Sequence, residues 1–261
     1  MKDTTPAPEA ERRNPKSETA SIVIPAFNEA SRIEGCVRSV ARWVRSQPGG
    51  WDWEFVLVDD GSTDDTAVRA RRFAEEEKLA LRLLSHRENR GKGAAIRTGV
   101  LASAGDPILI SDTDLSTPLS EWVKLAERLP ACPVSIGSRA LEQDLVRKRQ
   151  ALYRVLLGKA GNLVIRLIAV PGIHDTQCGF KLFRGEVARE LFGQARIDRF
   201  AWDVEVLYLA RRRGYPIAEV PVLWFNSPES KVRIVRDTLQ TLWDVLRIRW
   251  IHRRDPNLKR D

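Results

Sequence analysis

Two carboxylates stand two residues apart in the segment Asp112-Thr113-Asp114, directly after the apolar run 107–111. An apolar run of this length, bounded by turn residues, is typical of a buried strand, so the pair is expected at the strand's carboxyl end. Open α/β sheets bind ligands at that end. A hard cation such as Mg²⁺ or Mn²⁺ takes oxygen ligands from one or two carboxylates and completes its shell with phosphate and water. An acidic pair alone is more often a solvated turn, so the interpretation depends on the surrounding sequence.

Polar side chains also follow two earlier apolar stretches of the chain. Asn28 and Glu29 come after the first stretch, and Asp59 and Asp60 come after the second. If these stretches are parallel strands, their carboxyl ends meet at one edge of a sheet, and that edge can hold a nucleotide. Carboxylates there can accept hydrogen bonds from the N–H groups of a base and from ribose hydroxyls. The later acidic pair would then hold a cation on the diphosphate.

The segment 89–93, Asn-Arg-Gly-Lys-Gly, opens a predicted helix. Its glycines permit close approach of the backbone, and Lys92 supplies a positive charge that can face a phosphate. Alone, the segment is equally consistent with an ordinary helix start that carries a surface lysine. The segment 59–62 alone is likewise consistent with a turn that caps a helix. The occurrence of all these segments in order favours a nucleotide site.

The elements that must position these residues alternate between short apolar strands and helical stretches, which indicates a parallel α/β sheet. The second helix is expected to begin near Thr63. Ser62 or Thr63 can cap its N-terminus, and the carboxylates of Asp64 and Asp65 interact favourably with the positive end of the helix dipole. We therefore expect a three-layer, Rossmann-like α/β/α domain up to about Arg139. The strands are expected at 21–25, 54–58, 81–85, 108–111 and 134–137, and the helices at 29–46, from 63 onward and at 91–104.

The pattern then changes to two cationic amphipathic stretches. Residues 145–170 carry apolar side chains at helical spacing among Lys and Arg, and the segment 230–252 places Leu239, Leu242, Trp243, Leu246 and Trp250 at three- and four-residue steps. Such helices can lie in a membrane interface, or they can pack their apolar stripe on the rest of the protein. The chain is accordingly divided into a disordered polar tail (1–19), a large α/β domain (20–228, with interface helices at 145–170) and a basic amphipathic C-terminal helix and tail (229–261).

Composition narrows the class of partner. The 261 residues are 43% hydrophobic and 30% charged, and the net charge of +8 points to nucleic acid, a membrane surface or a phosphorylated substrate. The sequence has no zinc-finger spacing and no recognisable nucleic-acid-binding motif, which argues against nucleic acid. Cys36, Cys132 and Cys178 are too widely spaced for a disulfide framework, so a reducing cytosolic setting is expected. No signal-peptide core and no run of roughly 18 apolar residues is present, so we expect no bilayer crossing.

Four segments, in order, resemble the family 2 glycosyltransferases of the GT-A fold. They are 24–29 (Ile-Pro-Ala-Phe-Asn-Glu), 58–64 (Val-Asp-Asp-Gly-Ser-Thr-Asp), 89–93 (Asn-Arg-Gly-Lys-Gly) and 112–114 (Asp-Thr-Asp). The later segments 137–139, 175–183 and 202–205 look like the dolichyl-phosphate β-glucosyltransferase branch, near the dolichyl-phosphate mannosyltransferases. The resemblance covers about residues 21 to 250 and implies that 20–228 is a GT-A catalytic domain.

The resemblance implies roles for individual residues. Asp112 and Asp114 would hold Mg²⁺ or Mn²⁺. In the mannosyltransferase relatives, a glutamine two residues beyond the second aspartate also ligates the metal, but this position is Ser116 here. The nucleotide-sugar would be lined by Pro25, Phe27, Asn28, Glu29, Asp59, Asp60, Lys92 and Asp112. The acceptor phosphate would be held by the basic side chains Arg139, Arg154 and Lys181.

The reaction that the resemblance implies is an inverting, metal-dependent transfer of a hexose, expected to be glucose from UDP-glucose, to a polyprenyl phosphate such as dolichyl or undecaprenyl phosphate. The ionised lipid phosphate attacks the anomeric carbon opposite the leaving diphosphate, which gives a β-linked lipid phosphosugar. Positioning and charge neutralisation then carry most of the rate. Asp203 and Glu205 would orient basic groups or the sugar, or form a helix-face salt bridge. The catalytic residues would be Asp112, Asp114, Arg139, Lys181 and Asp203.

Two alternatives stay open. A family 2 enzyme that transfers sugar to a hydroxyl acceptor in glycan synthesis needs a general base, and Asp203 is the candidate. A catalytically silent nucleotide- or lipid-binding module is the second alternative, although a pure binder would not require both the acidic pair and the basic acceptor residues. In the main hypothesis, the enzyme is cytoplasmic and associates peripherally with the cytoplasmic face of a membrane.

Overall fold

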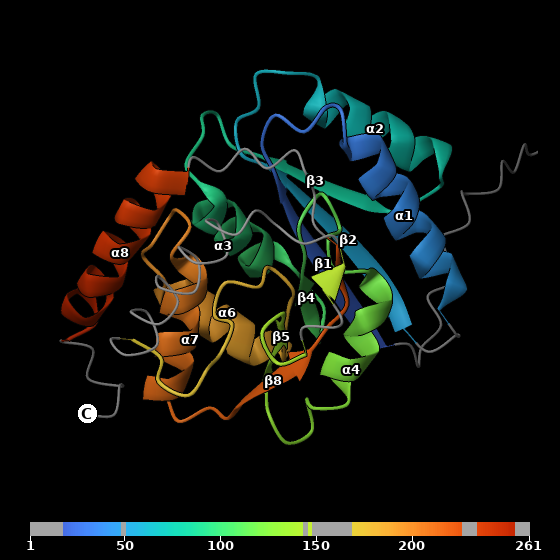
Figure 1. Ribbon diagram of the computed structural model, residues 1–261. Helices are drawn as coiled ribbons and strands as arrows, with labels where there is room; N and C mark the ends of the chain where they lie inside the picture. Colours follow the sequence, from blue (N-terminus) through green and yellow to red (C-terminus); the bar gives the residue numbers. More distant parts are fainter. Residues whose placement is uncertain (1–17, 48–50, 143–145, 148–168, 226–233, 254–261) are drawn as a thin grey trace, which may run out of the picture.

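The computed structural model shows a seven-stranded mixed sheet covered by helices on both faces (Figure 1). It describes residues 18–47, 51–142, 146–147, 169–225 and 234–253. The strand order is β3-β2-β1-β4-β7-β5-β8, in which β7 runs antiparallel to both β4 and β5. The strands of this sheet are β1 (Glu18–Ala26), β2 (Trp51–Asp59), β3 (Leu81–Ser85), β4 (Ile108–Ile110), β5 (Val134–Ser138), β7 (Lys181–Phe183) and β8 (Ile217–Pro221). A two-stranded sheet pairs β6 (Val146–Arg147) with β9 (Trp224–Phe225).

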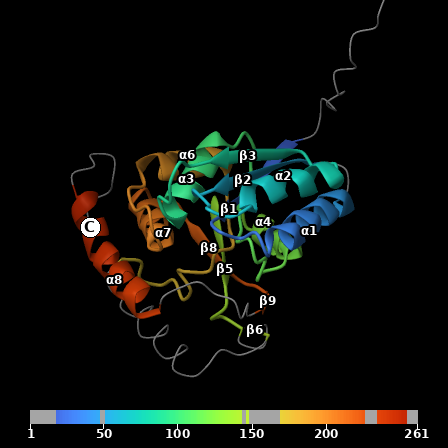
Figure 2. The ribbon, with the colours of Figure 1, turned by 90° about the horizontal axis from the view of Figure 1, so that it is seen from above.

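The helices form two layers, which Figure 2 shows on either side of the sheet. One layer contains α1 (Ile33–Ser46), α2 (Thr66–Glu76), a short 3-10 turn η1 (Leu119–Glu121) and α4 (Trp122–Ala126). The opposite layer contains α3 (Lys92–Ala102), α6 (Gly185–Gln194) and α7 (Trp202–Arg212). The last helix, α8 (Ile234–Ile251), lies beside α7 at the edge of the molecule (Figures 1 and 2).

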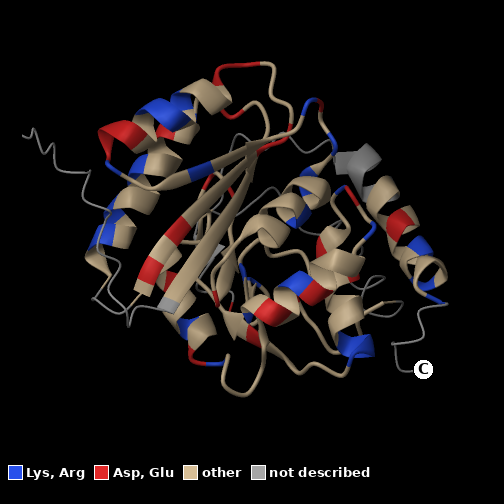
Figure 3. Cartoon of the chain, turned by 180° about the vertical axis from the view of Figure 1, so that it is seen from behind, with Lys and Arg blue, Asp and Glu red and all other residues tan. Residues whose placement is uncertain are grey.

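The alternation of side chains along each strand explains the two layers. In β1, Ile22 and Ile24 enter the core beneath α1 and α2, whereas Val23 enters the core beneath α3 and α7. The fit of α3 on the sheet is close, because a Cβ on Gly99 would lie 2.5 Å from Val23 Cγ1. Figure 3 is consistent with this arrangement, since the strands are mostly tan and most positions of Lys, Arg, Asp and Glu fall on helices and loops. The predicted three-layer α/β/α domain is confirmed.

The predicted elements up to 139 are found with small shifts at their ends. The first strand begins at Glu18, two residues inside the predicted polar tail, and the strand predicted at 81–85 has those bounds. The elements η1, α4, α6, β8 and β9 were not predicted. Of the stretch 145–170, the structure describes only 146–147 and 169–170, and residues 1–17 lie outside the described chain. The helix prediction is wrong at 146–147, which form strand β6, and the remaining predicted helical residues 148–168 lie outside the described chain.

The C-terminal helix packs with one face and exposes another. Val245 and Ile248 are fully buried in the core that α7 shares, while Trp243, Leu246 and Trp250 are 59%, 53% and 61% exposed. The predicted helix at 230–252 is confirmed as α8, and its predicted apolar stripe points outward rather than onto α7. In the described part of the chain, α8 included, no helix has the length and apolar character needed to cross a membrane.

A buried hydrogen bond fastens the end of α8 to α7. Nε2 of His252 lies 2.7 Å from Oε1 of Glu205, and both side chains are buried. The same carboxylate accepts hydrogen bonds from the backbone N–H groups of Arg196 and Ile197. Glu205 was expected either to orient basic groups or the sugar, or to form a salt bridge on the helix face; in the structure its partners join α7, α8 and the loop before α7.

We predict that His252→Ala lowers the free energy of unfolding by roughly 1–3 kcal/mol, because a buried carboxylate loses one of its donors. Urea unfolding followed by circular dichroism measures this change. Arg253→Ala, a change at the neighbouring exposed position, is the control and should stay within about 0.5 kcal/mol of the wild type. Equal stabilities of the two variants would contradict the proposed anchor.

Candidate active site

The predicted polar residues meet at the carboxyl edge of the parallel strands. β1 pairs with β2 so that Ala26 lies opposite Asp59, and β1 pairs with β4 so that Val23 lies opposite Ile110. The loops after these three strands are therefore neighbours. The strand order runs from β1 to β2 and β3 in one direction and places β4 on the other side of β1, so β1 and β4 flank the point where the strand order reverses, and open α/β sheets bind their ligands at such a point.

The acidic turn after β4 is tied to the end of β1. The hydroxyl of Thr113 donates to the carbonyl of Pro25 at 2.8 Å, and the backbone N–H of Ser116 donates to Oδ1 of Asp114 at 3.0 Å. Leu115 has φ 46°, a left-handed conformation that is uncommon for a residue with a branched side chain. These contacts hold Asp112 half-buried and Asp114 exposed at the switch point.

Lys92 at the start of α3 is joined to this turn. Its Nζ lies 2.6 Å from Oδ1 of Asp112. Burial alone would lower the pKa of Lys92, but Asp112, assisted by Asp203 and Asp114, raises it. Gly91, which precedes the helix, has φ 108°, and a Cβ there would lie 2.4 Å from the carbonyl oxygen of Asp198. The glycine therefore lets α3 begin against this loop, with a protonated lysine at its positive end.

The loops after β1 and β2 form the predicted base and ribose side. Asn28, at φ 53°, accepts a hydrogen bond from the backbone N–H of Thr63 at 2.8 Å, and its own N–H donates to Oγ of Ser62. The ring of Phe27 is 38% exposed, whereas Asp59 is buried. The structure thus brings these predicted residues together, with Asn28 joining the two loops and Phe27 offering a ring to solvent.

Asp60 has a different environment from the one expected of a ribose-binding carboxylate. It is buried, and four donors surround its oxygens: the side chains of His86 and Asn89 and the backbone N–H groups of Arg90 and Gly91. All four belong to the loop that leads into α3. Asp60 therefore fixes the loop that carries the glycine-lysine segment.

On the other side of the site, Arg139 follows β5 and is held by a bidentate ion pair. Its Nε and a terminal nitrogen donate to the two oxygens of Asp175 at 2.7 and 2.9 Å, and its backbone N–H donates to the same carboxylate. Burial opposes both charges, but each holds the other ionised: Asp175 raises the pKa of Arg139, and Arg139 lowers the pKa of Asp175. Glu219 accepts a hydrogen bond from the N–H of Asp175 at 2.7 Å. The side chain of Arg139 as a whole is 33% exposed.

Lys181 and Asp203 lie beneath the site. Lys181 has no exposed surface, and its ammonium donates to the carbonyls of Thr176 and Cys178. Burial lowers the pKa of Lys181 and raises that of Asp203 to about 6, while the attraction between the two groups opposes both shifts. The structure therefore places Lys181 inside the protein, whereas the predicted contact with an acceptor phosphate would need its ammonium at the surface. Arg154, the third predicted phosphate ligand, lies outside the described residues.

The acidic turn fits a hard divalent cation only in part. Asp112 and Asp114 supply two carboxylates, and within the described ranges no group of three or more His, Cys, Asp or Glu side chains could hold a metal ion. Mg²⁺ and Mn²⁺ accept this arrangement, since they commonly bind one or two carboxylates and complete their shell with phosphate oxygens and water. The donor set therefore suits a cation that arrives with a diphosphate.

The structure adds residues that the sequence did not single out. Thr113 positions the acidic turn, Glu219 supports Asp175, and Gly179 lies against Asp112. Thr113 sits inside the acidic motif and could have been noticed, because a hydroxyl there can bond a neighbouring strand end. The other two act through contacts with residues far away in sequence.

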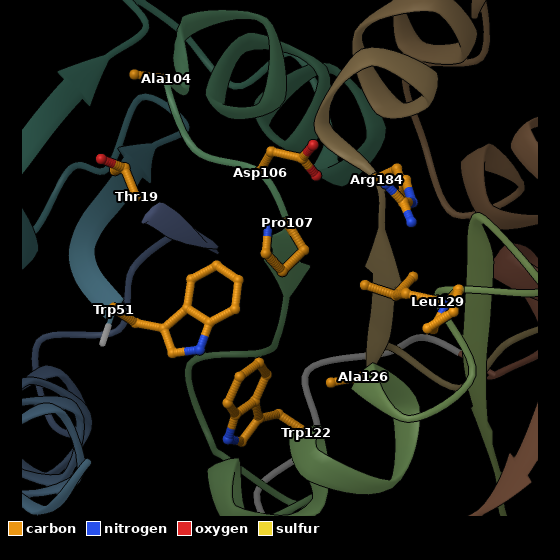
Figure 4. A pocket seen from close by; sticks show the side chains of 10 residues that line it. Thr19, Trp51, Ala104, Asp106, Pro107, Trp122, Ala126, Leu129 and Arg184 are labelled. Carbon is orange, nitrogen blue, oxygen red and sulfur yellow. The ribbon is translucent and has the colours of Figure 1, made fainter. Parts of the chain in front are cut away.

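A separate cavity of about 550 Å³ lies at the opposite edge of the sheet (Figure 4). Trp51, Pro107 and Trp122 line it, with Arg184 at one side. Trp51 and Pro107 lie at or before the beginnings of β2 and β4, whereas the acidic turn follows the end of β4. This cavity is therefore not part of the candidate active site.

The sheet, its switch point and the acidic turn define a glycosyltransferase of the GT-A type. The chain belongs to glycosyl transferase family 2, whose family model matches residues 21–192. The predicted family, fold class and enzyme class are confirmed.

Relatives within the family are similar over most of the chain. The chain is 34% identical to a dolichyl-phosphate beta-glucosyltransferase of Dictyostelium discoideum over 241 residues, covering 88% of this chain and 73% of the relative. It is also 34% identical to the Homo sapiens protein of that name, covering 88% of this chain and 74% of the relative.

Solved structures share the fold. Mannosyl-3-phosphoglycerate synthase from Rubrobacter xylanophilus superimposes with a TM-score of 0.65 at 19% identity, covering 93% of this chain and 76% of that one. Glucosyl-3-phosphoglycerate synthase from Mycobacterium tuberculosis, in complex with Mn²⁺, UDP-glucose and glycerol 3-phosphate, has a TM-score of 0.58 at 22% identity, covering 87% of this chain and 80% of that one. At these identities, the likeness concerns the fold.

We predict a pH-dependent effect of Asp203→Asn on stability. The folded-state pKa of about 6 lies above the ordinary value of 3.8, so the stability that Asp203 contributes is present below about pH 4 and is lost as the pH rises through 6. Relative to the wild type, the free energy of unfolding of the variant should therefore rise by about 2–3 kcal/mol between about pH 4 and pH 7. Urea unfolding across this range measures the difference. Asp52→Asn, at an exposed position, should run parallel to the wild type, and parallel behaviour of Asp203→Asn would contradict the prediction.

Proposed function

We propose that the protein transfers glucose from UDP-glucose to a polyprenyl phosphate, with dolichyl phosphate as the acceptor indicated by its relatives, and that the product is β-linked. The observation that carries this proposal is the meeting of two opposite kinds of site at one sheet edge. The acidic turn of Asp112 and Asp114 suits a metal-bound diphosphate, and Arg139, across the same edge, offers a fixed cation to a second phosphate. The names of the relatives support the sugar and the acceptor.

The donor side combines a nucleotide pocket with a site for the leaving group. Phe27 and Asp59 lie where a base and ribose would bind, and Lys92 lies where it can face the diphosphate. Mg²⁺ or Mn²⁺, held by Asp112 and Asp114, would neutralise the charge that develops on the leaving UDP. A neighbour of the same fold binds both Mn²⁺ and UDP-glucose, which supports this assignment.

On the acceptor side, a phosphate needs a cation to bind it more than it needs a general base to activate it. A lipid phosphate is already ionised near neutral pH, so one of its oxygens can attack the anomeric carbon directly. The new bond joins this oxygen to the anomeric carbon. At the same time, the bond between the anomeric carbon and the β-phosphate oxygen breaks, and its electron pair leaves with UDP. Arg139, held in place by Asp175, would bind the attacking phosphate and orient it.

The position of Asp203 favours a phosphate acceptor over a hydroxyl acceptor. A general base must reach the proton that it removes. Asp203 is buried in the first turn of α7, and it interacts with the enclosed Lys181 and the N–H of Val204. We therefore assign it the role of fixing the charges around the acceptor, and we do not assign it the role of base.

We further propose that the protein works at a membrane surface, because its acceptor is a lipid. The outward face of α8 carries Trp243, Leu246 and Trp250 on one stripe, with the exposed Arg247 and Arg249 alongside. Tryptophan and arginine together suit a bilayer interface with anionic lipids. The three cysteines are free, in keeping with the cytoplasmic face as the proposed location.

Product analysis tests the chemical proposal. We expect the protein, given Mn²⁺, UDP-[¹⁴C]glucose and a polyprenyl phosphate, to move label into the organic phase as an acid-labile β-linked product. Asp114→Asn should lower this turnover at least about tenfold, since it removes a predicted metal ligand, while Asp52→Asn on the surface should keep it. Label that enters only a hydroxyl-bearing acceptor, or full metal-dependent turnover by Asp114→Asn, would contradict the proposal.

Flotation with liposomes tests the membrane proposal. We expect the wild type to float with vesicles that contain anionic lipid, and the triple change Trp243→Ser, Leu246→Ser and Trp250→Ser to reduce the floating fraction severalfold, because it removes the exposed apolar stripe. Transfer to a short, water-soluble polyprenyl phosphate should be unchanged in this variant. Val68→Ser on α2, which is 71% exposed, is the matched control. Equal flotation of wild type and triple variant would exclude α8 as the membrane contact.

A further inference from the structure

A tight turn before β7 lies against the predicted metal ligand Asp112. A Cβ placed on Gly179 would lie 2.2 Å from Oδ2 of Asp112 and 2.8 Å from its Cγ. Real side chains do not approach this closely, so the carboxylate occupies the space that any side chain at position 179 would need. Gly179 is not one of the described glycines that have a positive φ, so other residues could also adopt its backbone conformation. The three atoms nearest to such a Cβ all belong to the carboxyl group of Asp112.

The carboxylate of Asp112 is thus confined from two directions. Lys92 holds Oδ1 at 2.6 Å, and Oδ2 lies in the space beside Gly179 that a Cβ would fill. Asp112 lies two residues beyond the end of β4, and its side chain is 37% exposed. A short side chain with this much exposure could adopt other rotamers if the turn did not limit it.

Lys181 holds the turn from below. Its Nζ donates to the carbonyl of Thr176 at 3.0 Å and to the carbonyl of Cys178, which are the first and third residues of the turn that ends at Gly179. Lys181 itself is fixed in the middle of the sheet, where it pairs with Ile110 of β4 on one side and Ile136 of β5 on the other. The strand that leads to Asp112 and the lysine that supports the turn are therefore direct neighbours.

We propose that Gly179 and Lys181 are positioning residues for Asp112: the buried ammonium fixes the turn 176–179, and the turn fixes the carboxylate for the metal-bound diphosphate. This inference rests on the proposed function only in taking Asp112 as a metal ligand. It gives Lys181 an internal role in place of the phosphate contact expected from the sequence. Removing either part should weaken metal binding before it affects the acceptor.

Gly179→Ala tests the contact directly. Since the clash falls on a partly exposed side chain, Asp112 can rotate away, and the variant should fold with a melting temperature close to that of the wild type. Its affinity for Mn²⁺ in the presence of UDP, measured from the free-Mn²⁺ signal in electron paramagnetic resonance, should fall about 10–100-fold, as for changes next to metal ligands in general. Gly193→Ala in α6, where a Cβ meets nothing within 4 Å, is the matched control and should bind Mn²⁺ as the wild type does.

Two outcomes of this titration overturn different statements. If the wild type binds Mn²⁺ and Gly179→Ala binds it equally well, the positioning role is wrong while the proposed transfer reaction is untouched. If the wild type with UDP binds no Mn²⁺, both the metal assignment and the positioning role fail.

Lys181→Met separates the internal role from a contact with the acceptor. Methionine has similar length and no charge, so the variant loses the two hydrogen bonds to the turn. We expect weaker Mn²⁺ binding and, at saturating Mn²⁺, an unchanged KM for the polyprenyl phosphate. A raised KM for the lipid phosphate with unchanged Mn²⁺ affinity would show that Lys181 binds the acceptor, and would overturn its part in the proposal.

Discussion

The rest of the site depends on the compensation of carboxylate charge at the carboxyl edge of the sheet. An ionised carboxylate that is taken out of water costs several kcal/mol unless a cation and hydrogen bonds accompany it. Asp112 has Lys92, Asp175 has Arg139, and the buried Asp203 has the attraction of Lys181. The members of each pair come from different segments of the chain, so meeting this requirement also fixes the relative positions of α3, α7 and the loops after β4 and β5.

The same pairs prepare the site for anions. A cation that is already held by a carboxylate needs little reorganisation when a phosphate arrives, which is how preorganised charges lower a barrier. Arg139 is held on one edge of its guanidinium by Asp175 and keeps part of its surface exposed, while Lys92 lies at the positive end of α3. Lys181, in contrast, has all its surface inside the protein and acts on the site through the turn that it supports. Arg139, Lys92 and Lys181 therefore differ in how closely they would approach the phosphate groups in the proposed reaction.

How far the sequence could predict these features depends on whether the contacts are local. Strands β1 to β5 follow from apolar runs and turn residues, and the acidic motif follows its strand directly, so both could be predicted. The direction of β7 could not, because three residues with a lysine at their start do not show which neighbours they pair with. Likewise, the motif that contains Asp60 predicts a ribose ligand, and only the folded loop shows the four donors around its carboxylate. The fit of Gly179 to Asp112 joins residues from two separate motifs and has no local signature.

The outer helix α8 and Lys92 are connected by a short series of contacts. His252 at the end of α8 bonds Glu205, and Glu205 accepts the backbone N–H groups of Arg196 and Ile197. The next residue, Asp198, accepts the N–H of Ala94 in the first turn of α3 and confines Gly91. Packed elements transmit position because dense cores resist small displacements. Packing of α8 on α7 therefore helps to fix the start of α3, and with it Lys92, relative to the rest of the sheet.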